Sequence, residues 1–112
     1  MAKIDVLTVL RNPAGEGLID PAGKPITLRD VLVNALMANP PGDAPDAAEK
    51  LRRFDLARRA SRALLAPGAG ETLAAYVNLT AEEIATCKAC IDRAYGALVM
   101  APAWEALDPV DG

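Results

Sequence analysis

The sequence predicts a single α+β domain that is mostly helical, and three observations support this prediction. A polar residue followed three positions later by a carboxylate occurs at 27–30, 46–49 and 80–83, which is the pattern that begins a helix. Segments rich in proline and glycine separate the long stretches that follow these starts. The first part of the chain instead alternates β-branched and apolar residues with turn residues, which indicates short extended pieces. A length of 112 residues fits one domain over 1–112.

The N-terminal region, residues 3–26, predicts a small β-hairpin. Residues 4–10 are apolar and β-branched, and 20–23 form a turn with Pro21 at its second position. A hairpin alone is marginally stable in water, so we expect it to pack on helices or to pair with another extended piece. The stretch 76–79 is the candidate third strand, with an irregular loop as the alternative.

The helices are predicted from their caps and from the residues that end them. Each main helix follows one of the three capping motifs, and proline and glycine end the first two. Pro102 stands where the first residue of a short C-terminal helix tolerates proline, and Trp104 is expected to fold back onto the core. The predicted ranges are 28–38, 47–66 and 81–100 for the main helices, 102–107 for the short helix, and 39–45 and 67–72 for the loops between the main helices.

The middle helix, 47–66, is expected to be amphipathic, with one apolar side against the core and one charged side toward solvent. Arg52, Asp55, Arg59 and Arg62 recur at helical spacing on the charged side. The apolar side is predicted to consist of Leu51, Phe54, Leu56, Ala57, Ala60, Ala63, Leu64 and Leu65.

The net charge of −3 hides an uneven distribution. Residues 46–66 carry six basic side chains against three acidic ones, whereas acidic residues dominate from Glu71 onward. Such a distribution suits docking of the middle helix on the last one, or recognition of an acidic partner. Carboxylates at helical spacing pair with part of the positive charge, which also fits a solvated, salt-bridged face. Nucleic-acid modules concentrate more net positive charge, so nucleic acid is the less favoured partner.

The only motif that suggests site chemistry is the pair Cys87 and Cys90. A redox pair lies at a helix N-terminus, but the cap at Thr80 places both thiols well inside the predicted helix. A tetrahedral zinc site needs four ligands, and the chain has no histidine and no third cysteine, so only an oligomer could complete one. Cys87 falls on the apolar side of its helix, which favours a structural thiol. We therefore expect no catalytic residue, no metal site and no cofactor.

The start of the chain lacks the cationic and apolar pattern of a signal peptide. The longest apolar stretch, 94–104, is interrupted by glycine and proline and is too short to cross a bilayer. We expect a cytoplasmic protein with reduced thiols and no membrane partner.

The order of motifs resembles that of small uncharacterised accessory proteins encoded by tailed phages and prophages of proteobacteria. The resemblance lies in the short β start, the segment 26–36, the charged middle helix, the segment 79–84, and Tyr95 followed by 104–107. It implies a compact, non-enzymatic protein that acts by contact, either as a virion or tail assembly helper or as a factor that blocks or redirects a host machine. The resemblance carries over no catalytic residue.

Together these observations predict a protein-interaction module whose partner is a phage or host protein. The expected contact surface is the arginine side of the middle helix, with Arg52, Arg59 and Arg62, or the apolar end 98–107, which includes Trp104. The Ala-rich helix also suits self-association into an oligomer. Two alternatives remain open: a nucleic-acid-associated regulator that uses the same arginine side, and a thiol or metal function of Cys87 and Cys90 in an oligomer.

Overall fold

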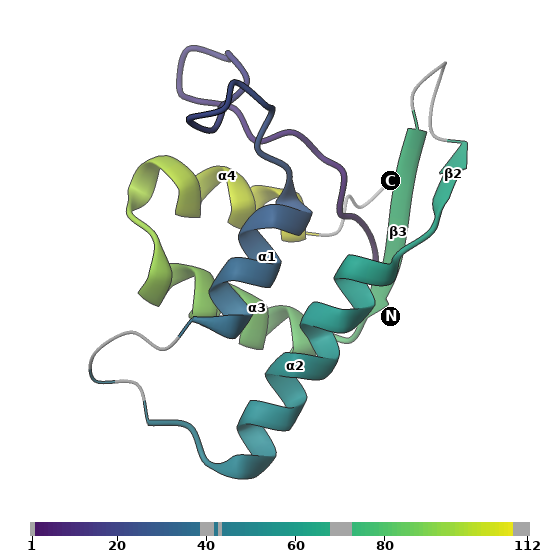
Figure 1. The fold of residues 1–112 in the computed structure, drawn as a ribbon, viewed down its shortest axis with the longest axis vertical. Helices are drawn as coiled ribbons and strands as arrows, with labels where there is room; N and C mark the ends of the chain where they lie inside the picture. The colour runs from purple at the N-terminus through teal and green to yellow at the C-terminus, as the bar shows by residue number, and fades with distance from the viewer. Residues whose placement is uncertain (1, 39–41, 43, 68–72, 109–112) are drawn as a thin grey trace.

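The computed structural model describes residues 2–38, 42, 44–67 and 73–108. It confirms a mostly helical α+β fold, in which the helices lie to one side of a small sheet (Figure 1). The loops predicted at 39–45 and 67–72 lie largely outside the described residues. The elements in chain order are β1 (Ala2–Asp5), α1 (Leu28–Met37), α2 (Ala47–Arg62), β2 (Leu65–Pro67), β3 (Leu73–Leu79), α3 (Ala81–Ala94) and α4 (Ala97–Leu107).

The sheet is antiparallel with the strand order β1-β3-β2. Ile4 pairs with Val77 on one edge of β3, and Ala66 pairs with Ala74 on the other. The predicted third strand at 76–79 is therefore confirmed as part of β3. Val77 is buried beneath the helices whereas its neighbour Tyr76 is partly exposed, which is the alternation of a strand with one covered face.

The N-terminal region makes two kinds of β pairing, one with the sheet and one within itself. Only β1 joins the sheet, and the segment that follows folds on itself through isolated antiparallel bridges, such as Val9 with Thr27 and Ile19 with Pro25. The predicted turn at 20–23 is confirmed, because the Gly23 N–H donates to the Asp20 carbonyl at 2.9 Å. Gly23 has a φ of 82°, a conformation that favours glycine.

Helix α1 lies at the centre of the helical layer and packs against α2, α3 and α4. Its start is fixed by a complete capping box between Thr27 and Asp30, and α3 starts with the same device between Thr80 and Glu83. The third predicted motif forms only half of its box. Asp46 accepts the Glu49 N–H at 2.8 Å, but the carboxylate of Glu49 pairs with arginine side chains on its own helix.

The prediction that the middle helix extends to 66 is wrong, since α2 ends at Arg62 and the chain enters β2 at Leu65. Ala66 precedes a proline, which disfavours the helical conformation there, and this segment supplies the edge partner of β3. The Arg29 side chain completes the helix end, because it donates to the Ala60 and Ala63 carbonyls at 3.0 and 2.9 Å.

The prediction of one helix over 81–100 followed by a short one over 102–107 is also wrong. Helix α3 ends at Ala94, Gly96 caps a new helix, and α4 runs through Pro102 to Leu107. The break lets α4 turn back onto α3 and α1, so that Leu107 becomes fully buried. Pro102 lacks the N–H that would bond the carbonyl of Leu98, so this helical hydrogen bond is missing within α4.

Within the described residues, no helix has the length and apolar character needed to cross a bilayer.

Candidate functional site

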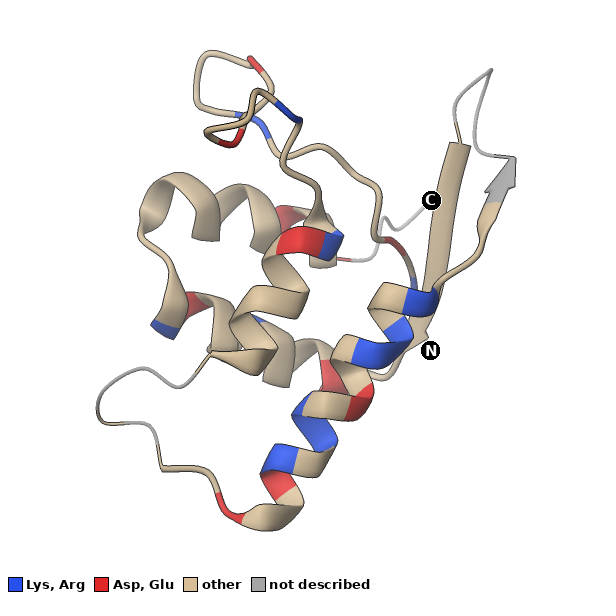
Figure 2. Ribbon diagram, viewed as in Figure 1, with Lys and Arg blue, Asp and Glu red and all other residues tan. Residues whose placement is uncertain are grey.

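Basic residues gather along α2, as the blue segments of Figure 2 show, and the arginines among them fall into two groups that differ in what they contact. One group, Arg53 and Arg59, is tied into the fold by carboxylates and carbonyls. The other, Arg52, Arg58 and Arg62, is exposed. The sequence pattern does not separate these groups, because both recur at helical spacing.

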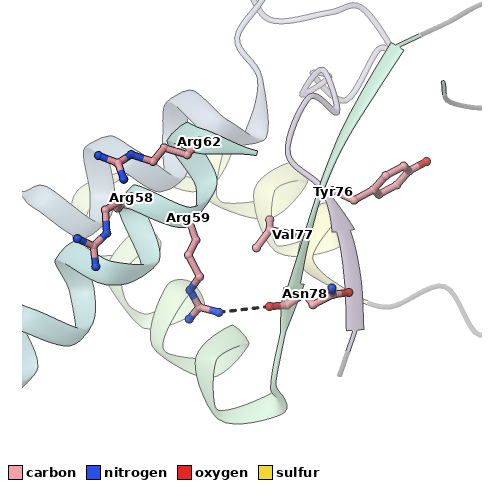
Figure 3. A pocket seen from close by; sticks show the side chains of 6 residues that line it. All are labelled: Arg58, Arg59, Arg62, Tyr76, Val77 and Asn78. Carbon is pink, nitrogen blue, oxygen red and sulfur yellow. Dashed lines mark hydrogen bonds between the residues drawn. The ribbon is translucent and has the colours of Figure 1, made fainter. Parts of the chain in front are cut away.

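Arg59 connects three elements. Its guanidinium pairs with Glu83 at the start of α3 and with Asp55 on its own helix at 3.2 Å, and it donates to the Asn78 carbonyl of β3 at 3.4 Å (Figure 3). Glu83 uses one carboxylate oxygen for this pair and the other to accept the Thr80 N–H at 2.9 Å. The hydrogen bond from Arg59, followed by that from Thr80, lowers the pKa of Glu83 below its ordinary value. Arg59 is therefore a structural cross-link, and its charge is already balanced.

At the N-terminal end of α2, Glu49 takes up part of the positive charge. It pairs with Arg53 at 3.3 Å and with Arg52 at 3.8 Å. Arg53 is almost fully buried, whereas about half of the Arg52 side chain is exposed. Arg52 and Arg53 line a hollow of about 300 Å³ between α2 and α3, to which Arg93 also contributes.

A larger hollow of about 530 Å³ lies between the C-terminal half of α2 and β3. Figure 3 shows Arg59 reaching across it toward Asn78, with Arg58 and Arg62 directed away from the strand. The structure thus places Arg59 and Arg62 around one hollow and Arg52 at another. Because Arg59 spans the larger hollow and is neutralised by Glu83, we do not regard that hollow as an anion-binding pocket.

The outward face of α2 carries large apolar side chains, which the sequence prediction placed in the core. The prediction is wrong for Leu51 and Phe54, whose exposures are 71% and 49%, and also for Leu64 and Leu65, which follow the helix and are 84% and 62% exposed. The buried side of α2 consists of Ala57, Ala60 and Leu56, together with Arg53.

Leu51, Phe54, Arg58 and Arg62 recur at intervals of three or four residues, so they line one side of α2; we call these four residues the outer stripe. The guanidinium of Arg58 lies over the Phe54 ring at 5.5 Å from its centroid. Arg58 also pairs with Asp55 at 3.0 Å, whereas Arg62 has no ion pair with any residue in the described part of the chain. The spacing of 51, 54, 58 and 62 was visible in the sequence, but which side faces solvent was not.

Trp104, the other predicted contact residue, packs partly buried against the core. Its indole N–H donates to the Lys88 carbonyl at 3.1 Å, and the Lys88 ammonium lies 5.5 Å from the ring centroid. Lys88 in turn pairs with Asp108 beyond the end of α4. Trp104 therefore joins α4 to α3 and lies apart from the arginines of α2.

Cys87 and Cys90 are not joined in a disulfide, and both are buried in α3. Burial, reinforced by the neighbouring Cys90, raises the pKa of Cys87 to about 12. A thiol in this setting stays protonated at neutral pH and is a poor nucleophile. Among the described residues, no three cysteine or carboxylate side chains come together as a metal ion would require.

No family model matches the chain, and no curated protein and no solved structure is significantly similar to it.

Proposed function

We propose that this protein is a non-enzymatic interaction module that binds a protein partner through the outer stripe of α2. The observation that supports the proposal is the exposure of Leu51 and Phe54 on a helix whose other side is packed. Scattered exposed apolar residues are common, but here two occur one turn apart and continue into two exposed arginines. Aromatic and arginine side chains are enriched at the centres of protein interfaces.

The composition of the stripe favours a protein over a nucleic acid. Half of its members are apolar, and Asp55 lies beside Arg58 within hydrogen-bonding distance. The chain as a whole carries a net charge of −3, which opposes approach to a phosphate backbone. A nucleic-acid contact would use Phe54 for base stacking and would leave Leu51 without a role.

The proposed setting is the one that the resemblance to phage and prophage accessory proteins implies. In that setting the module would assist particle assembly or alter a host machine by contact. No step of this proposal requires a reaction at the protein surface.

The proposal is tested by affinity capture with the double variant Leu51→Ser/Phe54→Ser. Extract from cells that naturally express the gene is passed over the immobilised wild-type protein, the double variant and a control, Leu98→Ser, which alters a leucine on α4 whose exposure lies between those of Leu51 and Phe54. We expect the wild type and the control to retain the same specific protein and the double variant to lose it. Equal capture by all three would refute a role for the stripe.

A further inference from the structure

We infer that the partner segment is an amphipathic helix with apolar anchors toward one end and carboxylates toward the other. This inference rests on the proposed function and adds the chemistry and the direction of the partner. It follows from the order of apolar and cationic residues along the outer stripe, from the charge balance of its cationic end, and from the backbone hydrogen bonding of α2.

The stripe has a direction along α2. Its apolar members, Leu51 and Phe54, lie in the N-terminal half of the helix, and its cationic members, Arg58 and Arg62, lie in the C-terminal half. The twelve residues from first to last span roughly 16 Å at the rise of an α-helix, and the midpoints of the apolar and cationic pairs lie roughly 11 Å apart, which is about two turns. A complementary segment must separate its apolar and charged contacts by a similar distance, so it cannot bind equally well in both orientations.

The cationic end of the stripe carries unbalanced positive charge. Asp55 is shared between Arg58 and Arg59, and Glu83 is engaged with Arg59. Among the three arginines at this end of α2, Arg58 and Arg59 pair with these two carboxylates. Arg62 has no carboxylate partner among the described residues. The Arg58–Asp55 pair is about half exposed on both sides, so it contributes little and leaves guanidinium donors available. Carboxylates on the partner would supply the missing charge.

The partner segment is expected to be helical because α2 offers only side chains. The backbone groups in the middle of α2 are bonded within the helix, so an extended segment would gain no backbone hydrogen bonds there and would bury its own unpaired groups. A helix satisfies its own backbone and presents side chains at intervals of three or four residues, which match the spacing of the stripe.

A second copy of this chain fits less well. Two parallel stripes would bring both Arg62 side chains together, and two antiparallel stripes would place each Arg62 against Leu51 of the other copy, so neither arrangement supplies a carboxylate to Arg62. Leu98 and Glu105 on α4 combine an apolar and an acidic side chain, but Arg11 lines the same hollow. That surface therefore lacks the unopposed negative charge that the stripe requires.

The test is a selection from a displayed library of helical peptides randomised on one face. The wild-type protein is one bait, and the variant Arg58→Glu/Arg62→Glu, whose stripe has reversed charge, is the other. From the wild type we expect peptides with large apolar residues one turn apart and aspartate or glutamate one to two turns away. From the reversed bait we expect lysine or arginine at those same positions.

Affinity measurements on the best acidic peptide complete the test. Fluorescence anisotropy should show binding at least tenfold weaker for Arg58→Gln/Arg62→Gln and for Leu51→Ser/Phe54→Ser, and unchanged for Leu98→Ser. Circular dichroism confirms that each variant is folded.

Several results would overturn the inference: no enriched helical peptide, no charge preference, an unchanged preference with the reversed bait, or salt-dependent dimerisation of the protein itself. Binding of a single-stranded DNA oligonucleotide that Arg58→Gln/Arg62→Gln abolishes, without any peptide binder, would do the same. If the selection fails while Leu51→Ser/Phe54→Ser still loses the natural partner, only the partner chemistry is wrong and the proposed function stands.

Discussion

Replacing Arg59 with methionine should destabilise the fold, whereas the same replacement at Arg62 should not. Methionine retains a similar apolar stem but removes the pair with Glu83, the pair with Asp55 and the hydrogen bond to Asn78. A hydrogen bond to a charged group contributes about 1.5–3 kcal/mol when buried, and an exposed pair within a helix contributes about 0.3–0.5 kcal/mol.

The exposure of these side chains reduces the expected loss. Arg59 is 35% and Glu83 23% exposed, so water screens part of their attraction. We expect the free energy of unfolding to fall by about 1–2 kcal/mol, which corresponds to a melting temperature about 4–8 °C lower for a domain of this size. Arg62→Met, which removes no ion pair between described residues, should change the free energy of unfolding by less than about 0.5 kcal/mol.

Urea unfolding monitored by circular dichroism measures both variants, with an unchanged m-value as the sign that the unfolding transition is comparable. Glu83→Gln keeps an oxygen that can accept the Thr80 N–H, so a double-mutant cycle of Arg59→Met with Glu83→Gln isolates the ion pair. Equal stability of the Arg59 and Arg62 variants, or additive effects in the cycle, would refute the assignment of Arg59 to the fold.

Three further predictions follow from the same contacts. Because Arg59 lowers the pKa of Glu83, the unfolded state binds more protons than the folded state at acid pH. The contribution of the Arg59–Glu83 pair to the free energy of unfolding should therefore be complete above the ordinary carboxyl pKa range and be lost as pH falls below about 4. Urea titrations across pH should therefore show a shallower acid dependence for Glu83→Gln, and an identical dependence would contradict the assigned pair. Cys87 and Cys90 should react with a disulfide reagent far more slowly in the native protein than in urea, because both are buried and the pKa of Cys87 is raised to about 12. Rapid labelling of the native protein would disprove that the two thiols are protected. Arg29→Met should lower the free energy of unfolding by about 1–2 kcal/mol, because it removes the side chain that donates to the Ala60 and Ala63 carbonyls at the end of α2. An unchanged free energy of unfolding in the urea assay would show that Arg29 does not stabilise this helix end.

The starts of α1, α2 and α3 could be predicted from sequence, whereas the ends of α2 and α3 and the start of α4 could not. A start depends on a cap and a carboxylate within four residues, as at Thr27 and Thr80, so the determining contacts are local. The end of α2 depends on the pairing of Leu65 with Ala75, ten residues further on, and on the Arg29 side chain from another helix. Capping motifs therefore encode where a helix begins, but they carry no information on the long-range contacts that determine where it ends.

The surface of α2 likewise has features that the sequence predicts and features that only the packing reveals. The spacing of its arginines identified a charged helix, but Arg59 and Arg62 are equivalent in that pattern. Only the position of Glu83, which is distant in sequence, makes Arg59 part of the fold. Likewise, α2 has more apolar residues than its neighbours cover, and only the packing shows that Leu51 and Phe54 remain outside.

Site-specific photo-crosslinking gives the most direct test of the claim that the outer stripe is the contact surface. A benzophenone amino acid is placed at position 54 or, as a control, at position 98, and the protein is irradiated in cells that naturally express it. A single discrete crosslinked protein should form from position 54 and be absent from position 98. Crosslinks to the same protein from both positions, or from position 98 alone, would contradict the account.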